Sequence, residues 1–203
     1  MSIPTATRET RRSERQAAIL RRAAEAFATG GFAATSMEDV AESAGVTKLI
    51  LYRYFDSKED LYRSALEQVS RRLTEEFVAA WSRGERSGVS ARTFLKVARD
   101  DPYGFRLLWR QSAREPAFAD YSARFREHAV EAAQTMIAPV LKDKSLRRWA
   151  AETAVTFLVE AMLNWLDEGN PARDDEFVEM MTSSLYAAVK AWASVSTKRV
   201  KKG

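Results

Sequence analysis

Residues 47–53 combine hydroxyl, cationic and aromatic side chains at a spacing suited to nucleic acid. If this stretch is helical, its outward side carries Thr47, Lys48, Leu49, Tyr52 and Arg53. Hydroxyl and cationic groups bind phosphates, while an arginine fork or an apolar side chain contacts base edges in the major groove. We therefore predict that this segment binds double-stranded DNA and reads its sequence.

Two short helices are predicted to position these side chains. Ser36 with Asp39 three residues later is a capping pair at the start of the first helix. Gly45 ends that helix in a left-handed turn, after which the second helix begins. A small residue, Ala41, stands where the two helices would touch. This arrangement is typical of a helix-turn-helix.

Composition limits the classes to which the protein can belong. The chain has 203 residues, 46% of them hydrophobic, with only 8 glycines and 5 prolines, which favours long helices. It has no cysteine, which excludes disulfides, thiolate zinc sites and a cysteine nucleophile. We find no signal-peptide pattern and no long uncharged apolar stretch. We expect a soluble, cytoplasmic protein without a membrane partner.

Positive charge is concentrated at the two ends of the chain. Residues 1–22 hold six arginines against two glutamates, and residues 198–203 hold four basic residues. We predict a flexible basic arm over residues 1–12 and a basic tail over residues 198–203. Two interpretations of the arm remain open, a segment that lies along a DNA groove and a solvated terminus.

Helical periodicity continues through the rest of the chain. We divide it into a helix-turn-helix domain at 13–57 and a helical body at 58–197, with Asp101 and Pro102 predicted to start a helix. The last two helices, at 146–166 and 174–195, carry more apolar surface than one core needs. Because helix-turn-helix proteins usually bind DNA as two-fold dimers, we predict an interface between copies of these helices. Its candidate residues are Trp165, Leu185, Val189 and Trp192.

Residues 13–61 resemble the DNA-binding region of the tetracycline-repressor (TetR) family of bacterial transcriptional regulators. The resemblance rests on a glycine–aromatic pair, an A-x-x-A-G-V-T segment and a Y-x-Y-F-x-x-K segment at the family's spacing. The matching residues are Phe27, Gly31, Phe32, Thr35, Ser36, Val40, Ala41, Ala44, Gly45, Val46, Thr47, Tyr52, Tyr54, Phe55, Lys58 and Leu61.

The resemblance implies an all-α homodimer with a three-helix DNA-binding head on a larger ligand-binding and dimerisation body. It assigns phosphate contacts to Thr35 or Ser36, Thr47, Tyr52, Tyr54 and Lys58. It assigns the major groove to Thr47, Lys48, Leu49 and Arg53. Leu49 departs from the family, which often has a small residue there, and it could contact a thymine methyl.

The middle helices could enclose an apolar ligand pocket, although aromatic residues at helical spacing can equally form a plain core. Its candidate lining residues are Phe94, Phe105, Leu108, Trp109, Phe125, Ala129, Phe157 and Met162. His128, the only histidine, is expected at the surface or at the pocket rim. Without a nucleotide-binding fingerprint, a carboxylate cluster or a nucleophile–base pair, we predict no enzyme activity, cofactor or metal.

These observations predict a ligand-responsive repressor that binds a palindromic operator as a homodimer and is released by a small apolar or amphipathic effector. Two alternatives remain open. One is a constitutive DNA binder with a filled core. The other is an enzyme or interaction protein that retains the head as a scaffold.

Overall fold

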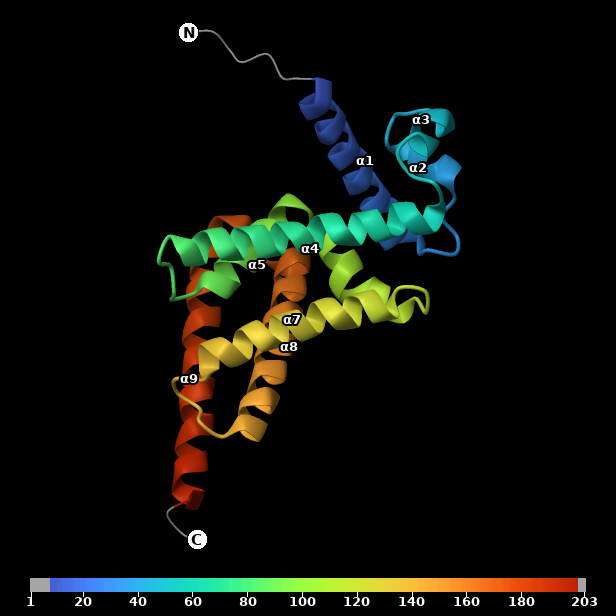
Figure 1. Ribbon diagram of the computed structural model, residues 1–203. Coiled ribbons are helices and arrows are strands. Elements are labelled where there is room, and N and C mark those ends of the chain that lie inside the picture. The colour runs from blue at the N-terminus through green and yellow to red at the C-terminus, as the bar shows by residue number, and fades with distance from the viewer. Residues whose placement is uncertain (1–7, 201–203) are drawn as a thin grey trace. The chain divides into compact units, whose positions relative to one another are not determined.

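The computed structural model describes residues 8–200, and its side chains up to Val195. All regular structure in this range is helical, so the predicted all-α class is confirmed (Figure 1). The α-helices are α1 Arg8–Gly30, α2 Met37–Ser43, α3 Lys48–Tyr52, α4 Lys58–Ser82, α5 Val89–Asp100, α6 Pro102–Arg106, α7 Ala119–Ile137, α8 Lys144–Glu168 and α9 Asp174–Val200. A π-turn at Leu107–Gln111 and 3-10 turns at Ser112–Arg114 and Pro171–Arg173 complete the set.

The chain forms two compact units. The head unit contains the chain up to Arg72 together with residues 101–119, and the body unit contains residues 73–100 and the chain from Asp120 onward. This grouping places the first part of α4 and the returning segment 101–119 with the three N-terminal helices. The sequence alone did not indicate that the head includes a segment so distant along the chain.

The two ends of the described chain are more helical than expected. α1 begins at Arg8, so residues 8–12 of the predicted arm are helical, while residues 1–7 lie outside the described range. Arginine and glutamate are good helix formers, and nothing in this stretch breaks a helix. α9 likewise extends to Val200, so residues 198–200 of the predicted tail are helical and residues 201–203 lie outside the described range.

An aromatic cluster forms the core of the head unit. The rings of Phe27 and Tyr62 meet edge to face at 5.0 Å, and those of Phe32 and Phe118 do so at 5.1 Å. Tyr62 and Phe118 stack with centroids 4.2 Å apart. Such pairs stabilise a core beyond the area that they bury. Phe118 comes from the returning segment, which explains why this segment groups with the head.

Burial also affects the Tyr62 hydroxyl. Its removal from water raises the pKa of Tyr62 above its ordinary value, and the Glu115 carboxylate raises it further. The Tyr62 hydroxyl is therefore harder to ionise than that of an exposed tyrosine. Its role in the head is that of a packed ring.

The returning segment is held by a cap and by a contact with α1. The carboxylate of Asp101 is buried and accepts a hydrogen bond of 2.9 Å from the backbone N–H of Gly104, with Pro102 in the first turn of α6. The cap predicted from the sequence is thus confirmed. Further along, Gln111 donates a side-chain hydrogen bond of 3.3 Å to the carbonyl of Ala28 in α1.

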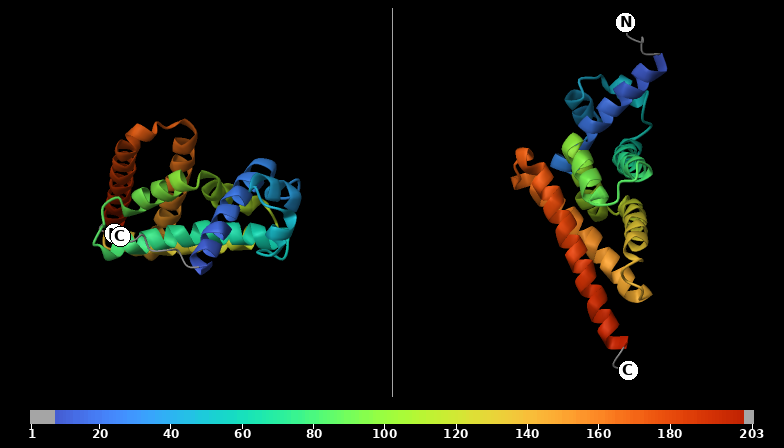
Figure 2. Two further views of the ribbon diagram at one scale, coloured as in Figure 1. Left: turned by 90° about the horizontal axis from the view of Figure 1, so that it is seen from above. Right: turned by 90° about the vertical axis from the view of Figure 1, so that its left-hand side faces the viewer.

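The body unit is built from the end of α4 with α5, α7, α8 and α9. α8 and α9 lie side by side and run antiparallel (Figure 2). Arg99 of α5 donates two hydrogen bonds, of 3.0 and 2.8 Å, to Asp174 at the start of α9. The indole N–H of Trp165 in α8 donates to the same carboxylate at 2.7 Å. One carboxylate therefore ties three helices of this unit together.

Candidate functional site

Local capping interactions fix the backbone of the helix-turn-helix. The Ser36 hydroxyl accepts from the N–H of Asp39 at 3.1 Å, and the Asp39 carboxylate accepts from the N–H of Ser36 at 2.8 Å. These hydrogen bonds, the one from the Ser36 backbone first, hold the pKa of Asp39 below its ordinary value. Gly45 has φ +63°, a left-handed conformation that a side chain disfavours. The turn between the helices is therefore set by its own residues.

The orientation of α3 follows from one buried residue. Leu51 is fully buried, and the Thr47 hydroxyl caps the helix by accepting from the N–H of Ile50 at 3.3 Å. This orientation turns the opposite side outward. The side chain of Leu49 is 74% exposed and that of Tyr52 is 44% exposed, and Arg53 is also exposed. Most of the predicted base-reading surface thus faces solvent.

Lys48 lies on the same exposed side and is held by its neighbours. Its ammonium forms an ion pair with Glu38 of α2, and it lies 5.7 Å from the centroid of the Tyr52 ring. Both contacts are at the surface, where an ion pair contributes little to stability. A DNA phosphate or base edge could therefore replace Glu38 as the partner of Lys48.

Two predicted phosphate contacts have other partners. Thr35 is buried, and its hydroxyl donates to the carbonyl of Gly31 at 2.8 Å, with that of Ala26 at 3.3 Å. The Thr35 hydroxyl closes the end of α1 and is not free to bind a phosphate. Ser36 remains the candidate for this contact. The Lys58 ammonium donates to the carbonyl of Phe32 at 2.9 Å and lies 4.4 Å from that ring's centroid. A phosphate contact by Lys58 stays a prediction.

Tyr54 links the end of the helix-turn-helix to α1. Its ring is half-buried next to Phe55, with centroids 6.2 Å apart, and the guanidinium of Arg12 lies 5.7 Å from the Tyr54 centroid. The segment that follows α3 and the first turns of α1 thereby become neighbours. This neighbourhood was not apparent from residue spacing.

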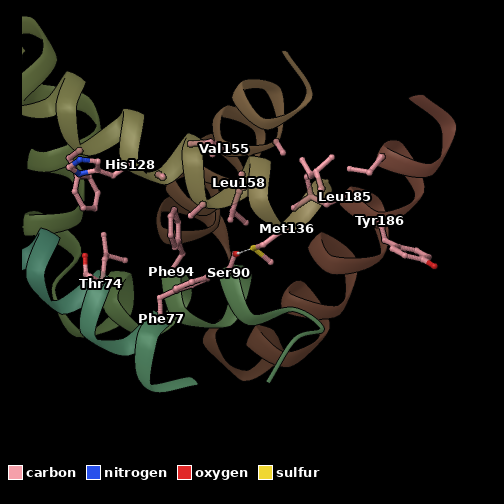
Figure 3. Close-up of a pocket in the computed structure, with 18 of the residues that line it drawn as sticks. Thr74, Phe77, Ser90, Phe94, His128, Met136, Val155, Leu158, Leu185 and Tyr186 are labelled. Carbon is pink, nitrogen blue, oxygen red and sulfur yellow. Dashed lines mark hydrogen bonds between the residues drawn. The ribbon is translucent and has the colours of Figure 1, made fainter. Parts of the chain in front are cut away.

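The body unit contains a cavity of about 430 Å³ that is open to solvent on one side and lined by residues of the end of α4 and of α5, α7, α8 and α9 (Figure 3). Three of the candidate pocket residues, Phe94, Phe125 and Ala129, are among those that line it. The other lining residues are Leu73, Thr74, Phe77, Ser90, His128, Ala132, Ala133, Met136, Ile137, Val140, Ala154, Val155, Leu158, Leu185, Tyr186 and Val189. This volume is within the range of small-molecule sites.

Five predicted pocket residues lie elsewhere. Phe105 and Leu108 are buried in the head unit, and Trp109 lies in the same segment. Phe157 is exposed on α8, and Met162 is buried away from the cavity. They are not among the residues that line this cavity, because helical periodicity identifies an apolar face but not what that face packs against. A usable signal was missed on α7, where small residues recur at 129, 132 and 133 and leave room between helices.

Few polar groups line the cavity, and none of its lining residues is an aspartate, glutamate, lysine or arginine. The hydroxyl of Ser90 lies 3.8 Å from the sulfur of Met136. His128 is exposed at the rim, as expected, and lies with Thr74 at one end of the cavity in Figure 3. Tyr186, at the other end, directs its hydroxyl away. The cavity therefore suits an apolar body with one polar group near His128.

The residues predicted at the dimer interface have contacts within their own chain. Trp165 stacks on Phe177 of its own chain with centroids 4.7 Å apart, while Leu185 and Val189 line the cavity. Trp192 meets Trp149 edge to face at 4.9 Å. Side chains that α8 and α9 leave exposed include Leu146, Trp149, Phe157, Met180, Tyr186 and Val195.

Within residues 8–200, no group of histidines and carboxylates is arranged to hold a metal ion. No helix of this range is long and apolar enough to span a bilayer.

Comparison with known proteins identifies relatives of both units. Residues 19–65 match the model of the bacterial regulatory proteins of the tetR family. The transcriptional activator FasR of Mycolicibacterium smegmatis is 27% identical over 83% of this chain and 80% of its own. The regulator RutR of Escherichia coli is 36% identical over 47% of each chain. The crystal structure of a TetR-like regulator from Rhodococcus sp. RHA1 covers 91% of this chain and 98% of its own, with a TM-score of 0.73 at 18% identity.

Proposed function

Because the chain belongs to the TetR family of bacterial transcriptional regulators, we propose that it is a cytoplasmic, ligand-responsive repressor that binds a palindromic operator as a homodimer. The observation that carries the DNA-binding part is the exposed side of α3. Leu49, Tyr52 and Arg53 face solvent there although two of them are large and apolar or aromatic. The exposure of apolar, aromatic and cationic side chains on one side of a helix supports a role in binding.

Dimerisation is supported by the outer faces of α8 and α9. Trp149 is 51% exposed, and Phe157 and Met180 are also exposed, which leaves a large apolar surface uncovered in one chain. A two-fold dimer carries two heads, as a palindromic operator requires. Heads that read successive turns of the major groove must stand about 34–36 Å apart.

A charged residue on this surface tests the interface. Phe157→Glu would bury an unpaired carboxylate between the copies, which costs several kcal/mol. We expect folded monomers by sedimentation, with operator affinity reduced at least tenfold. Asp167→Glu, an exposed change near the end of α8, is the control and should stay dimeric. A dimeric Phe157→Glu variant would exclude this face.

The effector is proposed to occupy the cavity of the body unit. Aromatic and aliphatic side chains such as Phe77, Phe94 and Phe125 form most of its wall, which favours an apolar or amphipathic molecule. The polar group of an amphipathic effector would face His128. Such a molecule shifts the equilibrium between a DNA-binding and a DNA-releasing conformation only by the difference in its affinity for the two.

The experiment has two stages that use the full chain. Selection from a random DNA pool should yield a two-fold symmetric sequence, and titration of apolar compounds into that complex should release the DNA. Transcription from the selected sequence in a reporter strain then shows the direction of regulation. Recovery of no preferred sequence would contradict operator binding. Compounds that bind without releasing DNA would contradict the effector role.

A further inference from the structure

The first turns of α1 carry a row of arginines that the helix-turn-helix does not explain. Arg8, Arg11, Arg12 and Arg15 are spaced i, i+3, i+4 and i+7 in a continuous helix. At about 100° per residue, these four side chains fall within an arc of roughly 100°. Glu9 and Glu14 fall outside the arc, one on either side. We call this arc the arginine row.

The guanidinium groups of the arginine row are exposed and lack acidic partners. Among the described residues, no carboxylate lies within ion-pair distance of any of the four. Arg22, further along α1, shows the contrast because it pairs with Glu25 at 2.8 Å. The row therefore presents uncompensated positive charge to solvent.

This arrangement is unfavourable for the helix itself. Like charges three and four residues apart repel one another, and the N-terminus of a helix favours anions over cations. Local stability therefore does not explain the row. Binding to a polyanion does, because it neutralises the charges.

The position of the row points to the same DNA duplex that α3 would read. Arg12 contacts Tyr54, the second residue after α3, so the row continues the proposed DNA-binding surface. Figure 1 shows the first turns of α1 and α3 on the same side of α4. From Arg8 to Arg15 the helix rises about 10 Å, a length over which duplex DNA presents several phosphates.

We propose that the arginine row binds phosphates of the operator that flank the bases read by α3. This inference rests on the proposed function, and it extends the DNA contact from the recognition helix to α1. Phosphate contacts carry no sequence information directly, so the row should strengthen binding to all sequences.

The test is the salt dependence of DNA binding by the full chain carrying Arg11→Gln and Arg15→Gln. Each lost phosphate contact lowers the slope of log affinity against log salt by about 0.9. We expect the slope to fall by about 1.8, with a ten- to fiftyfold loss at about 0.1 M salt on both operator and random DNA. A double Arg→Lys variant should retain most of the slope.

Arg21→Gln is the matched control, because Arg21 is an exposed arginine of the same helix that lies outside the arc. Its slope should remain that of the wild type. An unchanged slope in the double Gln variant, or an equal decrease of the slope per residue in Arg21→Gln, would contradict phosphate binding by the arginine row. Neither result would contradict operator binding. A wild-type chain that binds no duplex would instead contradict the proposed function as a whole.

Discussion

The core of the head unit is filled with side chains, whereas the body unit contains a cavity that is open on one side. In the head, Tyr62 and Phe118 are almost completely buried and stack directly on one another. In the body, Phe94 and Phe125 face a cavity of about 430 Å³. A close-packed core has one arrangement of side chains, while an unfilled one can repack around an occupant. The comparison suggests that the head presents a fixed surface and that the body is the adaptable part.

The two units also differ in how their polar groups are paired. The helix-turn-helix is held by hydrogen bonds over three residues, such as Ser36 to Asp39. The body depends on pairs between distant segments, such as Arg99 with Asp174 and Arg148 with Glu127. The form of the helix-turn-helix is thus set locally, and the form of the body depends on how its helices assemble.

Removing a ring from the filled core of the head unit is expected to have the largest effect. Phe118→Ala deletes a fully buried side chain, and such changes cost about 3–5 kcal/mol. Chemical denaturation should show this loss together with reduced DNA binding. Tyr103→Ala is the control, because Tyr103 is 37% exposed and lies outside the proposed DNA, dimer and cavity residues, so its loss should cost about 1 kcal/mol or less. Equal losses would contradict the distinction between core and surface rings.

Filling the cavity of the body unit should imitate an effector. Ala129 lines the cavity, and Ala129→Trp would occupy part of it from within. We expect operator affinity to fall about ten- to hundredfold, equivalent to about 1.4–2.8 kcal/mol, while the head stays folded. Fluorescence of the neutral probe N-phenyl-1-naphthylamine should also lose its cavity signal. If the cavity is blocked and operator affinity is unchanged, filling the cavity does not control DNA binding by the head.

A change on the fixed surface of the head should alter sequence preference. Arg53 is exposed at the end of α3. Arg53→Ala should cost about 1–3 kcal/mol at one base-pair position and little on random DNA. Tyr52→Ala is the comparison, and it should weaken binding to all sequences alike. Equal effects of Arg53→Ala on operator and random DNA would contradict its role in reading bases.

The smallest predicted effect concerns the pairing of distant segments in the body. Hydrogen bonds from Arg99 first, and from Trp165, hold the pKa of Asp174 below its ordinary value, against the effect of burial. Because the folded-state pKa is lowered, this stabilisation is present above about pH 4 and is lost as the pH falls through the folded-state pKa. Asp174→Asn should cost about 1–2 kcal/mol at pH 7, since the pair is partly screened by solvent.

Thermal unfolding at pH 7 and pH 3 checks this prediction. The difference between wild type and Asp174→Asn should shrink at the lower pH. Asp175→Asn, at an exposed neighbouring position, is the control and should unfold like the wild type. A difference that persists unchanged at pH 3 would mean that the ionised carboxylate is not what ties the helices together.

Predictions from the sequence were accurate for features that depend only on neighbouring residues. The caps at Ser36 and Asp101 and the turn at Gly45 depend on residues within three or four positions, and the structure confirms all three. Thr35 shows the limit, because its hydroxyl closes the end of α1 and no pattern of spacing reveals that partner.

In the body, the sequence predicted helices and apolar faces but not how the faces meet. Trp165 and Leu185 are both large apolar residues on the last two helices, and both were predicted at the dimer interface. Trp165 packs inside its own chain, and Leu185 lines the cavity. Their locations depend on the rotation of α8 and α9 against α5 and α7, which only the assembled structure defines.

The return of residues 101–119 to the head has a consequence for protein engineering. The simplest design of a hybrid regulator joins the DNA-binding half of one protein to the sensing half of another at a single point in the chain, the crossover. Here, a crossover after Arg72 would separate Tyr62 from Phe118, whose ring covers it. The exchangeable module is therefore discontinuous, and a working chimera must transplant both pieces or match the second one to the first.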